Sequence, residues 1–136
     1  MEDELKAIIA LNPVPADLMI TYDDRHGLWG GTLLVLQGDG NLKRQTQVAG
    51  SAQAVGLTQQ VSEQELRELV RLLVELEAWA QRVPNRLPVP DESRAYLTIQ
   101  VNGQMSRMWE WFNDMAKNDR LMRIKVWMEE VGRSPK

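Results

Sequence analysis

The only histidine of the chain, His26, follows two acidic residues, Asp23 and Asp24. Imidazole and carboxylate groups are zinc ligands, but a zinc site normally needs three or four matched ligands in a closed set. The chain has no cysteine and no second histidine to complete this one. We therefore interpret the segment as a solvated turn, and we expect no metal site and no cofactor.

Two pairs of adjacent carboxylates, Asp91-Glu92 and Glu129-Glu130, are the other candidates for chemistry. General acid–base catalysis needs two groups placed across a substrate in contrasting environments, which adjacent acids do not provide. No serine has the context of a nucleophile elbow, and Ser62 is better explained as a helix cap. The chain has no recognisable catalytic set, so we expect a protein that is not an enzyme.

The sharpest candidate for a binding site surrounds the pair Asn102-Gly103. An Asn-Gly pair between two alternating runs is the strongest short-range sign of a two-residue hairpin, because both central residues must accept positive φ. With such a turn, directly opposed residues share a face of the sheet. One face then has the composition of a core: Ala95, Leu97, Ile99, Val101 and Met108.

The other face of this hairpin mixes aromatic rings with guanidinium groups. Trp, Tyr and Arg are common anchors in protein interfaces, and Arg94 over Trp111 can form a cation–π contact. The expected register pairs Tyr96 with Trp109, Thr98 with Arg107, and Arg94 with Trp111. The candidate protein-binding residues are the five large members of these pairs: Arg94, Tyr96, Arg107, Trp109 and Trp111.

A second interpretation assigns this face to the core, and it is the favoured one of the two. Trp and Tyr bury large areas, and the helices of the chain must bury their apolar stripes somewhere, so a helix is expected to cover the rings. Trp79 and Trp127 lie near helical stripes and are interpreted as core residues. A one-residue bulge at the turn would also move Trp109 and Trp111 to the opposite face.

Three helices are predicted from apolar residues at helical spacing. The first covers residues 2–11. The second begins at Ser62, which fits a capping box with Glu65, and its stripe continues to Ala80. The third covers residues 118–131.

The remaining elements are strands and turns. Residues 17–23 alternate, and residues 32–36 are apolar throughout, which is typical of a central strand covered on both faces. Residues 42–48 form a polar returning strand with the character of an edge. The stretch 49–60, rich in Gly, Ala, Gln and Ser, is interpreted as a mobile loop.

The composition limits the partner and the location. The formal net charge of -3 and the pI near 5.2 give no general attraction to phosphate backbones, so nucleic acid is disfavoured. The N-terminus is acidic where a secretory signal would be basic, and no apolar run approaches the roughly 20 residues of a membrane span. We expect a cytoplasmic protein that binds another protein or a second copy of itself, and no membrane.

The order of motifs resembles that of a known family. The motifs are Gly30-Gly31 before an apolar strand, Gly38-Asp39-Gly40, the helix start Ser62…Glu65-Leu66 with Leu69, then Leu97-Thr98-Ile99 and Gly103. Over residues 18–131 this order resembles that of emfourin-type small bacterial inhibitors of thermolysin-like proteases. The resemblance implies metalloprotease inhibition as an alternative function. The N-terminal helix and the tryptophan-rich hairpin depart from the family pattern, and no inhibitory residue is carried over.

The sequence thus predicts one α+β domain over residues 1–136. The expected fold is an antiparallel sheet of four to five strands with helices mainly on one face, in the approximate order α-βββ-α-ββ-α. The leading function is a small non-enzymatic protein-interaction domain. The alternatives are a metalloprotease inhibitor, and a small-ligand binder or hydrolase with an aromatic pocket.

Overall fold

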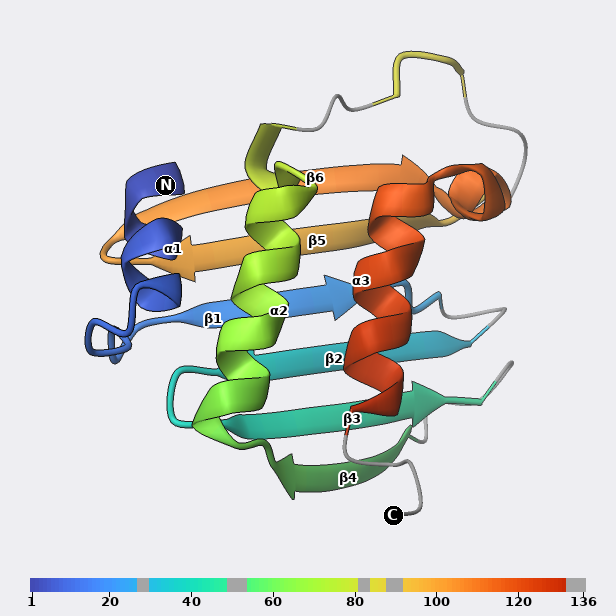
Figure 1. The fold of residues 1–136 in the computed structure, drawn as a ribbon. Coiled ribbons are helices and arrows are strands. Elements are labelled where there is room, and N and C mark those ends of the chain that lie inside the picture. The colour runs from blue at the N-terminus through green and yellow to red at the C-terminus, as the bar shows by residue number, and fades with distance from the viewer. Residues whose placement is uncertain (27–29, 49–53, 81–83, 88–91, 132–136) are drawn as a thin grey trace.

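The computed structural model describes residues 1–26, 30–48, 54–80, 84–87 and 92–131. In these residues six strands form one antiparallel sheet, and all three α-helices lie on one of its faces (Figure 1). The α+β class and the placement of the helices are as predicted, with six strands in place of four or five. The elements are α1 (Glu2–Ile9), β1 (Met19–Asp23), β2 (Gly31–Gln37), β3 (Asn41–Gln47), β4 (Ala54–Gln60), α2 (Glu63–Glu75), the 3-10 helix η1 (Ala78–Ala80), β5 (Arg94–Val101), β6 (Gln104–Trp111), the 3-10 helix η2 (Phe112–Lys117) and α3 (Asp119–Glu130).

The strand order is β4-β3-β2-β1-β5-β6, and each neighbouring pair is antiparallel. The first four strands follow one another across the sheet. After α2, the chain returns to place β5 against the free side of β1, and β6 follows β5 outward. The second hairpin therefore lies at an edge of the sheet, with β4 at the opposite edge (Figure 1).

The core lies between the sheet and the helical layer. Every second residue of a strand directs its side chain toward the helices, because side chains alternate between the two faces of a sheet. Each helix packs its predicted apolar stripe against these side chains. Trp79 and Trp127 are partly buried and pack against this core. Residues that are at most 1% exposed include Leu5 and Ile8 of α1, Ile20 and Tyr22 of β1, Leu34 and Leu36 of β2, Leu66 and Leu69 of α2, Leu97 and Ile99 of β5, and Leu121 and Ile124 of α3.

Specific hydrogen bonds fix the helix ends. Ser62 and Glu65 form the predicted capping box, in which each side chain accepts the other residue's backbone N–H at 3.1 Å. The C-terminal end of α3 is bound from the sheet, because buried Arg44 of β3 donates to Met128 O at 3.1 Å and to O of the C-cap residue Val131 at 2.7 Å. Within the described residues, no helix is both long and apolar enough to cross a bilayer.

One prediction about the edge of the sheet is wrong. Residues 54–60, expected to belong to a mobile loop, form the edge strand β4, so β3 is an inner strand. The Gly and Ala of this stretch lower its β-propensity, whereas Val55 and Thr58 favour a strand. All seven residues pair with β3. Residues 49–53 of the expected loop lie outside the described residues.

A second prediction fails at β2, which the described residues cover on one face only. Leu34 and Leu36 are buried under the helical layer, whereas Leu33 and Val35 are half-buried on the opposite face. Neighbouring strands partly shield them, since Val35 stands beside Lys43 in the β2–β3 register. An apolar residue on that face therefore does not require a second helical layer.

Candidate functional site

The second hairpin turns at Asn102 and Gly103 with the predicted geometry. Their φ angles are 48° and 75°, the paired positive values of a type I′ turn. The register of β5 and β6 runs without interruption from Arg94↔Trp111 to Val101↔Gln104. The predicted pairs Tyr96↔Trp109 and Thr98↔Arg107 are both present, so the predicted register is confirmed and the bulge is excluded.

A carboxylate from outside the hairpin holds this turn in place. Asp17, which precedes β1, accepts the N–H of Asn102 at 2.8 Å on Oδ1 and the N–H of Gly103 at 2.7 Å on Oδ2. The Gly103 bond, followed by the Asn102 bond, lowers the pKa of the Asp17 carboxyl below its usual value. The turn that sets the register of the site is therefore fixed to the start of the neighbouring strand.

The five candidate residues share the sheet face opposite the helices, which we call the open face. They alternate along β5 and β6 with residues that point into the core, such as Leu97 and Met108. The expectation that a helix covers these rings is wrong for the described part of the chain, because α1, α2 and α3 all bury their stripes on the other face (Figure 1). We call Arg94, Tyr96, Arg107, Trp109 and Trp111 the aromatic ladder.

The aromatic ladder is held together by stacking between arginines and rings. The Cζ atom of Arg94 lies 4.3 Å from the ring centroid of Trp109 and 4.9 Å from that of Trp111, which confirms the predicted cation–π contact. The two indoles meet edge to face, with centroids 4.9 Å apart and planes at 85°. Arg107 Cζ lies 4.4 Å from the ring centroid of Tyr96. Each guanidinium is thus positioned against an aromatic surface.

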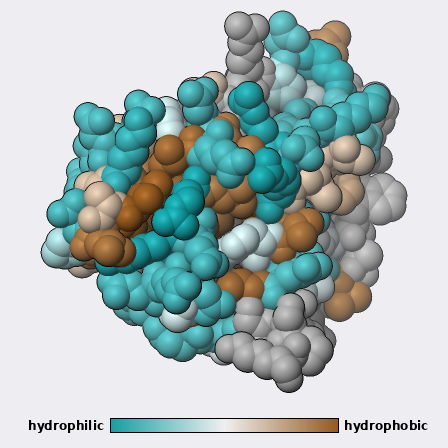
Figure 2. All heavy atoms as spheres, viewed as in Figure 1, coloured by the Kyte–Doolittle hydropathy of each residue, from teal (hydrophilic) through white to brown (hydrophobic). Residues whose placement is uncertain are grey.

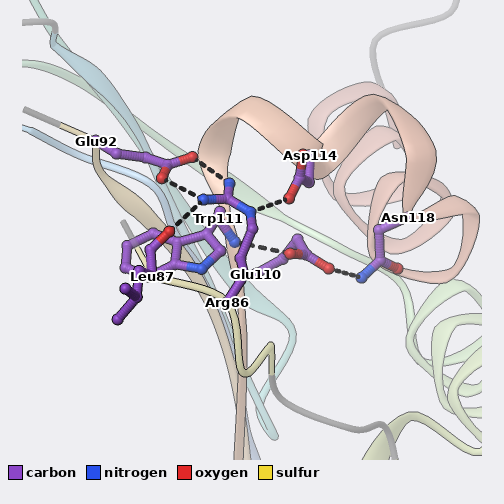
Figure 3. Close-up of polar contacts among 7 residues, drawn as sticks. All are labelled: Arg86, Leu87, Glu92, Glu110, Trp111, Asp114 and Asn118. Atoms are coloured by element: carbon purple, nitrogen blue, oxygen red, sulfur yellow. Dashed lines mark hydrogen bonds and ion pairs between the residues drawn. The ribbon is translucent and has the colours of Figure 1, made fainter. Parts of the chain in front are cut away.

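One end of the aromatic ladder is closed by Arg86, a residue that the sequence did not indicate. Arg86 donates to Asp114 at 2.9 Å and to both carboxylate oxygens of Glu92, at 2.8 and 2.5 Å, and its Cζ lies 5.2 Å from the Trp111 ring centroid (Figure 3). The hydrogen bonds to Glu92 are the main reason why the pKa of Arg86 is raised. Trp111 is only 3% exposed, so it anchors the ladder while Trp109 remains half-buried.

Two arginines of the aromatic ladder have no acidic partner among the described residues. Arg94 and Arg107 are both exposed, and in the described residues no carboxylate oxygen lies within 4.0 Å of either guanidinium. The nearby acid of the same face, Asp23, stands beside Tyr96 in the register but is bound through both oxygens to Arg25, each at 3.0 Å. Within the described residues, the guanidinium N–H donors of Arg94 and Arg107 are therefore available to a partner.

The acids beside His26 have structural partners. Asp24 is 3% exposed, accepts the Tyr22 hydroxyl at 2.7 Å and the Thr32 N–H at 2.6 Å, and pairs with Lys125 at 3.2 Å. Burial, followed by the charge of Asp24, raises the pKa of Tyr22. No cluster of His, Asp and Glu suited to a metal ion is found in the part of the chain that the structure describes. Asp24 thus ties β1, β2 and α3 together.

The helical face offers an apolar groove and no comparable set of charged anchors. A cavity of about 600 Å³ lies between α2 and α3 and is lined mainly by apolar residues, among them Leu72, Met122, Val126 and Trp127. The surrounding surface of the helical layer is largely hydrophilic, with apolar side chains between the polar ones (Figure 2). A small-ligand site normally adds a few converging polar groups to such a cavity, and among the described residues that line it only Arg123 and Glu130 are charged.

Comparison of the chain with protein-family models gives no match, and comparison with curated proteins gives none either.

Proposed function

We propose that this protein is a non-enzymatic interaction domain that binds a protein partner through the aromatic ladder on the open face. The observation that carries this proposal is the pair of exposed arginines, Arg94 and Arg107, each stacked on a ring and neither paired with a carboxylate in the described residues. The N–H groups of a stacked guanidinium that has no carboxylate partner can donate hydrogen bonds to a carboxylate or a carbonyl of another molecule.

The stacking also lowers the cost of binding. A free arginine side chain loses rotamer entropy when a partner immobilises it. Stacking on Trp109 restricts Arg94 before any partner arrives, and the edge-to-face contact with Trp111 restricts the Trp109 ring. Pre-ordered Trp and Arg side chains at the centre of a surface are typical of residues that dominate binding energy.

The test is selection of peptides from a random display library against the immobilised chain, followed by affinity measurements with purified variants. We expect Arg94→Ala and Trp109→Ala each to weaken the selected peptides by about tenfold or more. Arg123→Ala is the matched control, because Arg123 is an exposed arginine on the helical face. If no peptide is enriched, or if the control weakens binding as much as Arg94→Ala, the open face is not the binding surface.

A further inference from the structure

The outer edge of β6 carries backbone groups that no described strand pairs with. In a two-residue hairpin, the residues that flank the turn exchange hydrogen bonds, and such pairs alternate with non-hydrogen-bonded pairs along the ladder. At the far end of this hairpin the N–H of Phe112 donates to Ser93 O at 2.9 Å. This bond agrees with the alternation counted from the turn, in which every second residue of β6 is hydrogen-bonded to β5. The even-numbered residues of β6 therefore bond to β5, and the odd-numbered residues direct their N–H and C=O groups outward.

The same odd-numbered residues place their side chains on the open face. Met105 is 65% exposed, Arg107 is exposed and Trp109 is half-buried. The outward N–H of Trp111 already bonds to Glu110 Oε1 at 2.9 Å (Figure 3). Among the described residues, the edge that no strand pairs with therefore runs from Met105 to Trp109. Within the described part of the chain, a backbone edge without a partner strand and a row of recognition side chains thus belong to one short segment.

Resting on the function proposed above, we propose that the partner segment is an extended acidic peptide that pairs with β6 as a seventh strand. Strand addition uses backbone hydrogen bonds for affinity and alternate side chains for specificity. Side chains of the added strand on the open face would lie beside Arg107 and Trp109. Arg94 extends from β5 over the Trp109 ring, which brings its guanidinium toward the same strand.

The charges and the backbone edge distinguish this partner from two others. Two β6 strands paired antiparallel about Arg107, the middle residue of the edge, would place that arginine opposite its own copy, and like charges directly opposed are destabilising. Other registers of a β6–β6 pair avoid this contact but supply no carboxylate on the open face to either arginine. A single-stranded nucleic acid could stack on the rings, but it has no backbone that matches alternating N–H and C=O groups. An acidic peptide satisfies both the edge and the two arginines.

The probe is a fluorescein-labelled peptide that alternates glutamate with threonine, compared with glutamine–threonine and lysine–threonine peptides by fluorescence anisotropy. We expect the glutamate peptide to bind, the glutamine peptide to bind about tenfold more weakly, and added salt to weaken the glutamate peptide. Equal binding of the glutamine peptide would overturn the acidic assignment. Absence of binding, or preferential binding of an oligothymidine, would overturn the inference as a whole.

The strand geometry is tested separately with Met105→Pro, which removes an outward N–H of β6 without removing a bond to β5. The matched control is Thr58→Pro at the other edge, where the bond from Val61 N–H to Gly40 O shows that the N–H of Thr58 also points outward. We expect the first variant to lose binding by about tenfold and the second to retain it.

A measurement on the unmutated chain tests strand addition without a proline substitution in the sheet. Two versions of the glutamate peptide are N-methylated on alternate residues, so that only one version has the N–H groups that face β6. We expect one version to bind and the other to fail, and we expect slower hydrogen exchange of the Met105, Arg107 and Trp109 amides in the complex. If library peptides still require Arg94 and Trp109, but both methylated versions bind alike, then strand addition is wrong while the open face remains the binding surface.

Discussion

The guanidinium of Arg94 lies over the ring of Trp109, with Cζ 4.3 Å from the centroid. The two residues come from adjacent strands, and the type I′ turn places both on the face of the sheet that the helices leave open. This single contact joins the two features on which the proposed function depends, which are an available cation and a pre-ordered aromatic surface.

The contact between Arg94 and Trp109 should contribute measurably to folding. A double-mutant cycle with Arg94→Met and Trp109→Leu is expected to give a coupling free energy of about 0.5–1 kcal/mol, because exposed cation–π pairs are typically worth that much. The measurement is urea unfolding of the four proteins. A coupling indistinguishable from zero would mean that the stacking does not order the side chains.

Arg44, the buried arginine of β3, should contribute more to the free energy of unfolding than its exposed neighbour Lys43. Arg44→Met leaves the carbonyls of Met128 and Val131 without these donors, so we expect the free energy of unfolding to fall by about 1–3 kcal/mol. Lys43→Met is the matched control, since Lys43 is exposed on the opposite face of the same strand, and it should leave stability nearly unchanged. Equal effects of the two variants would contradict the role of Arg44 as the cap of α3.

The turn at Asn102 and Gly103 should make stability depend on pH through Asp17. The pKa of this carboxyl is lowered in the folded chain, so its contribution is fully present above its ordinary value near 3.8 and is lost as pH falls through the folded pKa. The stability difference between the wild type and Asp17→Asn should therefore be largest at neutral pH and shrink in acid. Thermal unfolding across this range measures it, and a difference independent of pH would show that the carboxylate charge is not involved.

Two glycines with positive φ should tolerate alanine to different degrees. At Gly103, with φ 75°, an added Cβ meets no atom within 4 Å, so Gly103→Ala should cost only the backbone strain of about 1–2 kcal/mol. At Gly31, with φ 138°, the Cβ would lie 2.5 Å from Asp24 O, so Gly31→Ala should be clearly more destabilising. Chemical denaturation of both variants tests the ranking, and equal losses would contradict the crowding at Gly31.

Local signals in the sequence were sufficient for the elements that depend on local chemistry. Asn102-Gly103 predicts the register of the second hairpin because only a few residue pairs accept two positive φ angles, and Ser62 with Glu65 predicts the start of α2 for a similarly local reason. The candidate residues could then be assigned to one face before any tertiary arrangement was known.

Features that depend on tertiary pairing were not predictable in the same way. Strand β4 pairs along its whole length with β3, a contact that the composition of the stretch 49–60 does not indicate. Arg86 contacts Asp114 and Trp111 because the fold brings these residues together. No spacing in the sequence indicates these contacts. Which face the helices cover is also a global outcome. In the described residues the three α-helices lie on the face opposite these rings, although Trp111 is buried by other contacts.

The most direct test of the proposed function is the response of the indole N–H resonances to a peptide selected from the library. Single Trp→Phe variants assign each resonance in a ¹H–¹⁵N spectrum. If the aromatic ladder is the binding surface, the Trp109 resonance should shift with added peptide while Trp127, beside the groove of the helical face, stays in place. A shift of Trp127 with Trp109 unchanged would place binding on the helical face and contradict the account.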